Sequence, residues 1–127
     1  MAKNDSRWAD VWKRAQEAGE RAASVVVPTP LGVTEIGATP AGGIGAVKSF
    51  TLAEGPGVYV WMRLSPGTHS FARWFKREVG GHTPRGGGVE HLLGGGGMER
   101  GKARARAIAE VIESEVGLQV LVWDVLD

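Results

Sequence analysis

The sequence predicts a small α+β protein that forms a single domain over residues 1–127, with helices packed on a mixed sheet. A length of 127 residues is enough for one compact core and too short for two ordinary domains. The hydrophobic pattern changes period along the chain, from every third or fourth residue in helical segments to every second residue in strands. The order of these segments is α-β-β-β-α-β-α-β. With 43% hydrophobic and 23% charged residues, the composition excludes disorder over most of the length.

The first element is an amphipathic helix over 6–23, with Asp5 or Ser6 as its N-cap. Trp8 and Trp12 lie one turn apart on its apolar stripe. We expect these two indole rings to dock the helix on the sheet. A helix that binds a partner protein is the alternative interpretation.

Three strands are expected next. The two prolines of VVVPTPLGVTEI exclude a helix there. Alternating apolar residues predict strands over 31–36 and 47–52, separated by a flexible glycine-rich loop over 37–46. The segment VYVWMRL, at 58–64, is the clearest strand pattern in the chain.

A short helix follows, because Phe71, Trp74 and Phe75 share one helical face. Thr68 or Ser70 is expected to cap its N-terminus, and two glycines end it. Shared spacing with the two phenylalanines places the Trp74 side chain in the core.

Glycine is the outlier of the composition, with 20 residues, seven of them between positions 86 and 97. We therefore expect a flexible glycine-rich loop over 80–97, interrupted by a short strand, VEHLL. A long helix over 98–116 follows, with Gly117 at its C-terminal end. The segment LQVLVWD closes the chain as a strand. The last β-α-β unit is expected to be a right-handed crossover between parallel neighbours.

A net charge of +1 conceals a basic middle of the chain. Residues 63–106 carry three acidic and nine basic side chains, the latter being Arg63, Arg73, Lys76, Arg77, Arg85, Arg100, Lys102, Arg104 and Arg106. The 21 residues that follow carry five acidic side chains and no basic ones. The sequence therefore places a basic segment before an acidic tail.

The stretch HLLGGGGMERGKARARA has the spacing G-x-x-x-x-G-K from Gly96 to Lys102, as in a phosphate-binding loop. Ala103 stands where a hydroxyl residue would bind magnesium. Only about 30 residues follow the start of this motif, too few for the remaining strands of a nucleoside triphosphatase. We therefore expect no such enzyme.

Electrostatics still predicts an anion site at the start of the last helix. Exposed backbone N–H groups, a glycine approach and several basic side chains favour phosphate there, to which a short basic helix and loop add two arginines. The predicted phosphate- or nucleotide-binding residues are Gly95, Gly96, Gly97, Arg100, Lys102, Arg104, Arg106, Arg85 and Arg73. The alternative interpretation is that these are solvated charges on a surface helix.

Other kinds of site find little support. The chain has no cysteine, which excludes disulfides and thiolate chemistry. His69, His82 and His91 are 13 and 9 residues apart, which matches no compact ligand motif, so no metal and no cofactor is expected. No serine or threonine stands in a nucleophile elbow. The absence of a long apolar run and of a signal peptide predicts a cytoplasmic protein that contacts no membrane.

Several blocks of the sequence resemble a family of small proteins from tailed-phage and prophage genomes. They are GVYVWMRLSPGTHSFARWF, a GGV strand start, MERGKARARAIAEVI and the terminal VLD. Family members have a GFAWV…P…SFARWL block, a helix like MERKEAYARAFAEVL and an ending like SRLD. The resemblance covers most of the chain and implies a viral origin, hence the host cytoplasm, but no established activity. Where the family has a polar turn and Lys-Glu, this chain has glycines at 95–97 and Gly101-Lys102.

Together these patterns predict a non-enzymatic phage accessory protein that binds a phosphate-bearing ligand. A nucleotide that serves as a host immune signal would be one such ligand, which gives the protein an anti-defence role. A protein that binds DNA or RNA through its basic middle is one alternative. A homo-oligomer, or a protein that grips a host protein without a small ligand, is the other.

Overall fold

The computed structural model describes residues 4–27, 31–38, 44–52 and 57–126. Its elements occur in the order expected from the sequence, and the α+β fold class is confirmed. They are α1 (Asp5–Ser24), β1 (Leu31–Ala38), β2 (Ile44–Leu52), β3 (Gly57–Ser65), α2 (Ser70–Glu78), β4 (Val89–Gly97), α3 (Met98–Val116) and β5 (Gln119–Leu126).

The central sheet has the strand order β4-β3-β5 and is antiparallel throughout. This corrects the expected mixed sheet. β4 and β5 do run in the same direction, as a β-α-β unit requires. However, β3 lies between them, so the two strands are not neighbours. The α3 connection therefore crosses over β3. The two pairings in the sheet, β3 with β4 and β3 with β5, are both antiparallel.

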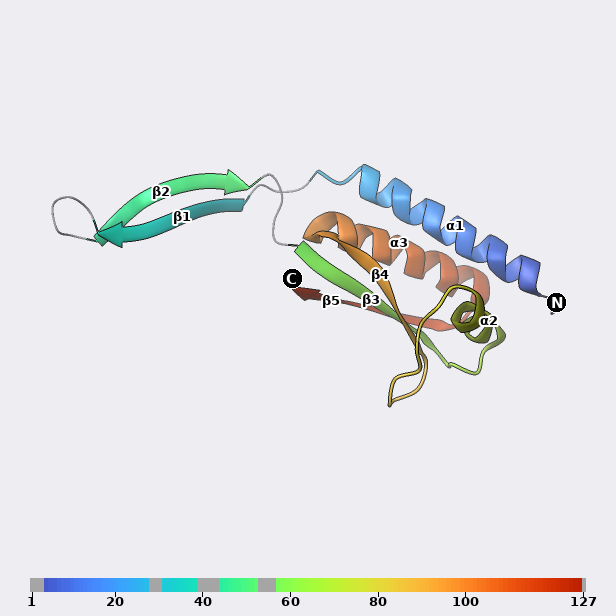
Figure 1. Cartoon of the computed structure of the whole chain (residues 1–127). Coiled ribbons are helices and arrows are strands. Elements are labelled where there is room, and N and C mark those ends of the chain that lie inside the picture. Colours follow the sequence, from blue (N-terminus) through green and yellow to red (C-terminus); the bar gives the residue numbers. More distant parts are fainter. Residues whose placement is uncertain (1–3, 28–30, 39–43, 53–56, 127) are drawn as a thin grey trace.

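The helices lie on one side of this sheet. α3 packs on all three strands, and α1 runs beside α3 (Figure 1). The expected docking of α1 on the sheet is corrected in detail, because its tryptophans meet α2, although Trp12 also reaches the sheet, with its ring 6.4 Å from that of His91 in β4. The rings of Trp8 and Phe71 are 5.6 Å apart, and those of Trp12 and Phe75 are 4.9 Å apart, both edge to face. Trp74 is 7% exposed, as the helical spacing predicts.

Strand alternation decides which residues enter the core. In β3 the even-numbered residues point toward the helices and are buried, while the odd-numbered ones point to the other face. The largest fully buried side chains come from the three helices, β3 and β4: Val11, Val58, Met62, Leu64, Phe71, Phe75, Val89 and Ile112. Two clusters of buried residues, a large one and a smaller one of Val58, Val60 and Ala105, thus hold the helices to a single face of the sheet.

The α1–α3 contact is close at Gly19. A methyl group built there would lie 2.8 Å from the Arg104 Cγ and 3.0 Å from the Ile108 Cγ1, so only glycine fits without a shift. At the other end of the contact, Arg14 donates to both carboxylate oxygens of Glu115. These hydrogen bonds lower the pKa of Glu115 below its ordinary value. The two helices are therefore held by close packing and by charge pairs such as this one.

The helix ends differ in detail from those expected. Asn4 is the N-cap of α1, in place of Asp5 or Ser6. The N-cap of α2 is His69, whose Nδ1 accepts a hydrogen bond from the backbone N–H of Phe71 at 3.0 Å, in place of Thr68 or Ser70. An imidazole nitrogen thus does what a hydroxyl oxygen was expected to do.

The strands β1 and β2 form a separate antiparallel pair that contains one β-bulge. Residues 37–38 and 44–46 belong to these strands, so the expected loop 37–46 is wrong at those positions, and 39–43 lie outside the described residues. Figure 1 shows the pair extending away from the helices and the central sheet.

Candidate functional site

The glycines of the predicted anion site form a strand. Gly95, Gly96 and Gly97 pair with the backbone of β3, opposite Tyr59, Val58 and Gly57 respectively. The short strand expected at 89–93 is confirmed, but the flexible loop expected after it is wrong for 94–97, because pairing with β3 overrides the low strand propensity of glycine. The chain passes directly from β4 into α3, whose N-cap, Gly97, makes no side-chain capping bond.

Two glycines of this stretch lie close to side chains of β3. The ring of Tyr59 lies against Gly95, since a methyl group built there would be 3.4 Å from the ring atoms Cδ1 and Cε1. A methyl group at Gly101 would be 3.3 Å from the Val60 Cγ2. Gly101 thus allows the start of α3 to approach β3 closely. Gly101 thus makes room for Val60, whereas a methyl group at Gly95 would be in ordinary van der Waals contact with Tyr59.

The basic residues of α3 point to different sides of the helix. Lys102 lies above β5, with its Nζ 3.6 Å from Asp124 Oδ1. Arg104 points toward α1, with its Nε 3.9 Å from Glu20 Oε1. Residues two apart on a helix are separated by about 200°. Lys102 and Arg106 therefore share one side of α3, and Arg100 and Arg104 share another.

The two remaining predicted arginines lie elsewhere. Arg73 borders a depression between α1 and α2 that Asp5 and Arg77 also line. Arg85 is exposed in the loop between α2 and β4. The predicted phosphate-binding residues are thus distributed over three parts of the surface. Those on α3 that have acidic neighbours, Lys102 and Arg104, offer less positive potential than the sequence alone suggests.

The three histidines each have a place in the fold. His69 caps α2, His82 bridges to β4, and His91 is half-buried against the ring of Phe75, 5.0 Å away. Burial lowers the pKa of His91 below its ordinary value. Among the described residues, no group of three or more histidine, aspartate or glutamate side chains is arranged to hold a metal ion.

The most prominent surface feature is the sheet face opposite the helices, which we call the open face. It carries six apolar or aromatic side chains in neighbouring register: Tyr59, Trp61, Leu92, Leu121, Trp123 and Val125. The exposed fractions of Leu121 and Val125 are 46% and 49%, and that of Tyr59 is 45%. Most exposed apolar residues of a protein are scattered, so a contiguous group of six sets this face apart from an ordinary surface.

The charged groups on the open face are paired with each other. Arg63 donates to Glu90, with 2.6 Å between Nη2 and Oε1, and its guanidinium lies 5.8 Å above the Trp123 ring. The other oxygen of Glu90 is 3.3 Å from His82 Nε2. Glu90 is only 13% exposed. The open face is therefore apolar, with little net charge.

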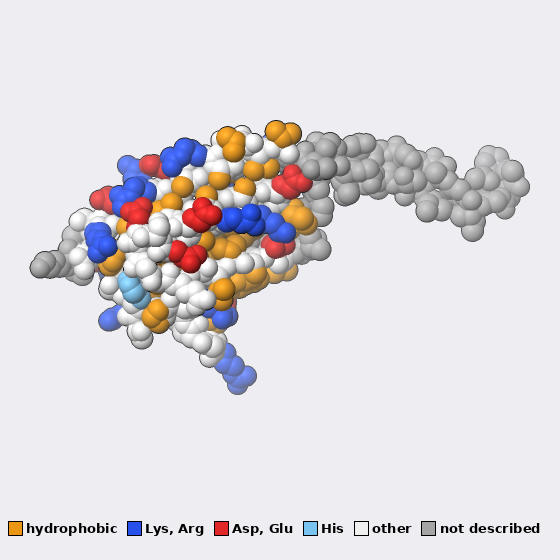
Figure 2. Space-filling model, turned by 180° about the vertical axis from the view of Figure 1, so that it is seen from behind, with side chains coloured by type: hydrophobic (Ala, Val, Ile, Leu, Met, Phe, Trp, Pro, Cys, Tyr) orange, Lys and Arg blue, Asp and Glu red, His pale blue; other side chains and the backbone are white. Residues whose placement is uncertain are grey.

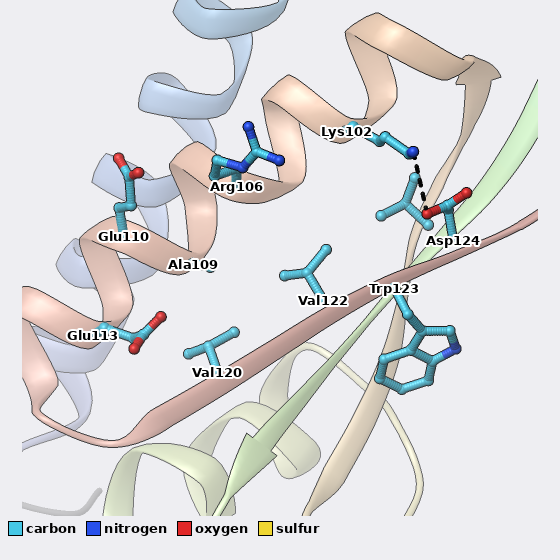
Figure 3. Close-up of a pocket in the computed structure, with 10 residues that line it drawn as sticks. Lys102, Arg106, Ala109, Glu110, Glu113, Val120, Val122, Trp123 and Asp124 are labelled. Atoms are coloured by element: carbon cyan, nitrogen blue, oxygen red, sulfur yellow. Dashed lines mark ion pairs between the residues drawn. The ribbon is translucent and has the colours of Figure 1, made fainter.

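A second feature is a groove between α3 and β5, on the side of the molecule shown in Figure 2. It has a volume of about 410 Å³. Val120 and Val122 of β5 and Ala109 of α3 line it, and Lys102 and Glu113 stand toward its two ends (Figure 3).

Sequence reasoning missed both features, although a signal was present. VYVWMRL and LQVLVWD are apolar at odd and even positions alike. A strand with one solvated face alternates apolar and polar residues, and a strand covered on both faces does not. Both segments therefore have the pattern of strands that are buried on both faces. In the described part of the chain, only one face of the sheet is covered.

Comparison with protein-family models, curated proteins and solved structures finds no match for this chain. No helix among the described residues is long and apolar enough to cross a membrane. The fold and the surface together define a class of protein: a small α+β domain with helices on one face of an antiparallel sheet and an apolar face left open.

Proposed function

We propose that this chain is an interaction protein, without catalytic activity, that pairs with a second copy of itself through the open face. The observation that supports this most is the set of six apolar and aromatic side chains on a sheet face that no described element covers. Packing two such faces together removes this area from water, which is the main favourable term in protein association.

The arrangement of the open face suits a symmetric pair. Trp61 and Trp123 are directly opposite each other in the register, at the middle of the face, and Leu92 extends the same row onto β4. Two copies related by a two-fold axis through this row would bring their tryptophans into contact. Face-to-face sheets pack in this manner, about 10 Å apart.

Charge argues against nucleic acid on this face. A nucleic-acid surface needs several basic side chains free to neutralise phosphates. Here the arginine on β3, Arg63, is already paired with Glu90. An apolar partner surface imposes no such requirement.

The size of the face predicts a weak dimer. Three strands of eight or nine residues cover roughly 27 Å by 14 Å, or about 400 Å². This is the area of a flat sheet, and the protruding side chains increase it. Stable interfaces bury about 800 Å² per partner. We expect a dimer with a dissociation constant in about the micromolar range.

Analytical ultracentrifugation over about three decades of concentration tests the proposal. Full burial of a leucine side chain contributes about 1.5–3 kcal/mol, and Leu121 is 46% exposed. Leu121→Asp therefore removes about 1 kcal/mol per copy, or about 2 kcal/mol from a symmetric pair. This weakens dimerisation about 30-fold, before any cost of burying the new charge.

Val27→Asp is the matched control, because Val27 is also exposed, at 87%, but follows α1. It should dimerise like the unaltered protein. A protein that stays monomeric at the highest concentration, or two variants that dimerise equally, would overturn the proposal. The open face would instead be assigned to nucleic acid if the protein bound a single-stranded oligonucleotide in a salt-sensitive manner and Trp61→Ala abolished that binding.

The phosphate-bearing ligand stays a prediction from the sequence. It now depends on Lys102 and Arg106, which share one side of α3. A thermal-shift screen against a nucleotide panel tests it. Stabilisation that Lys102→Ala or Arg106→Ala removes would support it, and no shift with any nucleotide would contradict it.

A further inference from the structure

The outer edge of β5 is a free strand edge in the part of the chain that the structure describes. β5 pairs with β3 along its length without a bulge, and it has a neighbour only on that side. The other edge strand, β4, has an irregular register with β3 and is bridged at Glu90 by His82. β5 also contains no proline. Such a regular edge presents unpaired backbone N–H and C=O groups that another strand can join.

The groove described above runs along this edge. Val120, Val122 and Ala109 give it an apolar lining, and α3 forms its opposite wall (Figure 3). A strand added to β5 would direct every second side chain into the space between itself and α3. Recognition of this kind combines backbone hydrogen bonds along the edge with side-chain pockets beside it.

The charges of α3 give the groove two different ends. Lys102 and Arg106 lie toward the end where β5 reaches Asp124, and Glu110 and Glu113 lie toward the other. The ion pair of Lys102 with Asp124 is loose, at 3.6 Å, which leaves the ammonium group able to bind a second carboxylate. A helix rises about 1.5 Å per residue, so the two pairs of charges are about 11 Å apart along α3.

We infer that this groove binds an extended segment of another protein, which joins β5 as an antiparallel strand and carries the pattern acidic-x-apolar-x-basic. Residues four apart in a strand are separated by about 13 Å, which matches the spacing of the charges. Because β5 runs from Val120 toward Asp124, an antiparallel segment meets Lys102 and Arg106 first. Its acidic residue therefore comes before its basic residue.

The sequence of this chain argues for a different protein as the occupant. The pattern acidic-x-apolar-x-basic occurs in it only at Asp10, Trp12 and Arg14. These residues belong to α1, where the Trp12 ring packs against Phe75. A second copy of the chain therefore has no free strand with this pattern.

The test is the binding of a fluorescent heptapeptide, Thr-Asp-Thr-Val-Thr-Lys-Thr, measured by polarisation with the full chain. The same residues with aspartate and lysine exchanged form the matched control peptide. We expect the first peptide to bind more tightly than the second. Lys102→Glu should weaken the first about three- to tenfold. The double variant Lys102→Glu/Glu113→Lys should reverse the preference between the two.

Further variants separate this inference from the proposed dimer. Lys13→Glu makes the same charge change on α1 and should leave binding unaltered. Leu121→Asp alters the open face and should also bind the peptide normally, whether or not it dimerises. In an NMR titration, the amide signals that shift should belong to β5 and the facing side of α3. Equal binding of both peptides, absence of binding at millimolar concentration, or shifts confined to the open face would refute the inference.

Discussion

Three consecutive glycines, Gly86, Gly87 and Gly88, provide a graded test of the loop between α2 and β4. Gly87 and Gly88 have positive φ angles of 88° and 82°, whereas Gly86 does not. A methyl group built at Gly86 or Gly87 meets nothing within 4 Å. At Gly88 it would lie 2.8 Å from the carbonyl oxygen of Leu64. Alanine at each position therefore meets a different obstacle.

The expected changes in unfolding free energy follow from these contacts. Gly86→Ala should be neutral or stabilise by about 0.4–1 kcal/mol, because alanine restricts the unfolded chain. Gly87→Ala should destabilise by about 1 kcal/mol, the cost of a left-handed backbone. Gly88→Ala bears the same cost and must also push β3 away, which adds about 1–3 kcal/mol. Its total loss is about 2–4 kcal/mol.

Urea denaturation followed by circular dichroism measures the three values, and thermal melting should repeat their order at about 4 °C per kcal/mol. The unaltered chain is the reference, and Gly86→Ala controls for the loss of a glycine as such. Equal stabilities of Gly87→Ala and Gly88→Ala, within about 0.5 kcal/mol, would show that this loop is not held against β3. That result would refute the close packing of Gly88 against the carbonyl oxygen of Leu64.

Three further predictions concern the core and its charges. Ile112 is fully buried, so Ile112→Ala should cost about 2–5 kcal/mol in denaturant unfolding and Ile112→Val only about 0.5–1.5 kcal/mol. Burial lowers the pKa of His91, so stability from its neutral form is present above about pH 6.5 and is lost as the pH falls toward the folded-state pKa. His91→Phe should flatten this part of a stability profile, and an unchanged slope would contradict the assignment. Arg14 lowers the pKa of Glu115. The contribution of the ionised Glu115 to stability is therefore present above its unfolded-state pKa and is lost as the pH falls through its folded-state pKa. Glu115→Gln should remove that loss from the profile in acid.

Local patterns in the sequence were enough to predict the elements and their order. The helix over 98–116 agrees with α3 at both ends, and Gly117 ends it in the left-handed conformation, at φ 87°. The clearest strand pattern, 58–64, is one residue shorter than β3 at each end. Periods of 3.6 and 2 residues reflect which side of a segment is buried, so they survive in the sequence without any knowledge of its neighbours.

The glycine run was misjudged because its conformation depends on a distant strand. Gly95 and Gly97 have no side chains that prefer a strand, and their pairing partners in β3 lie almost 40 residues earlier. Gly101 likewise appeared to belong to a phosphate-binding motif, but it allows α3 to approach Val60. A contact between segments so far apart leaves no periodic signal in either one.

Composition and periodicity by themselves determined a small α+β protein with a basic stretch before its last helix, because burial and charge are properties of single residues and their spacing. Only the tertiary structure decided how these residues meet. Antiparallel pairing of β4 and β5 with β3 gathered six apolar side chains on one open face. The turn of α3 sent Lys102 toward Asp124 and Arg104 toward Glu20. The rotation of α3 thus separated basic residues that are close in the sequence. The register of the strands brought together apolar residues that are far apart in it.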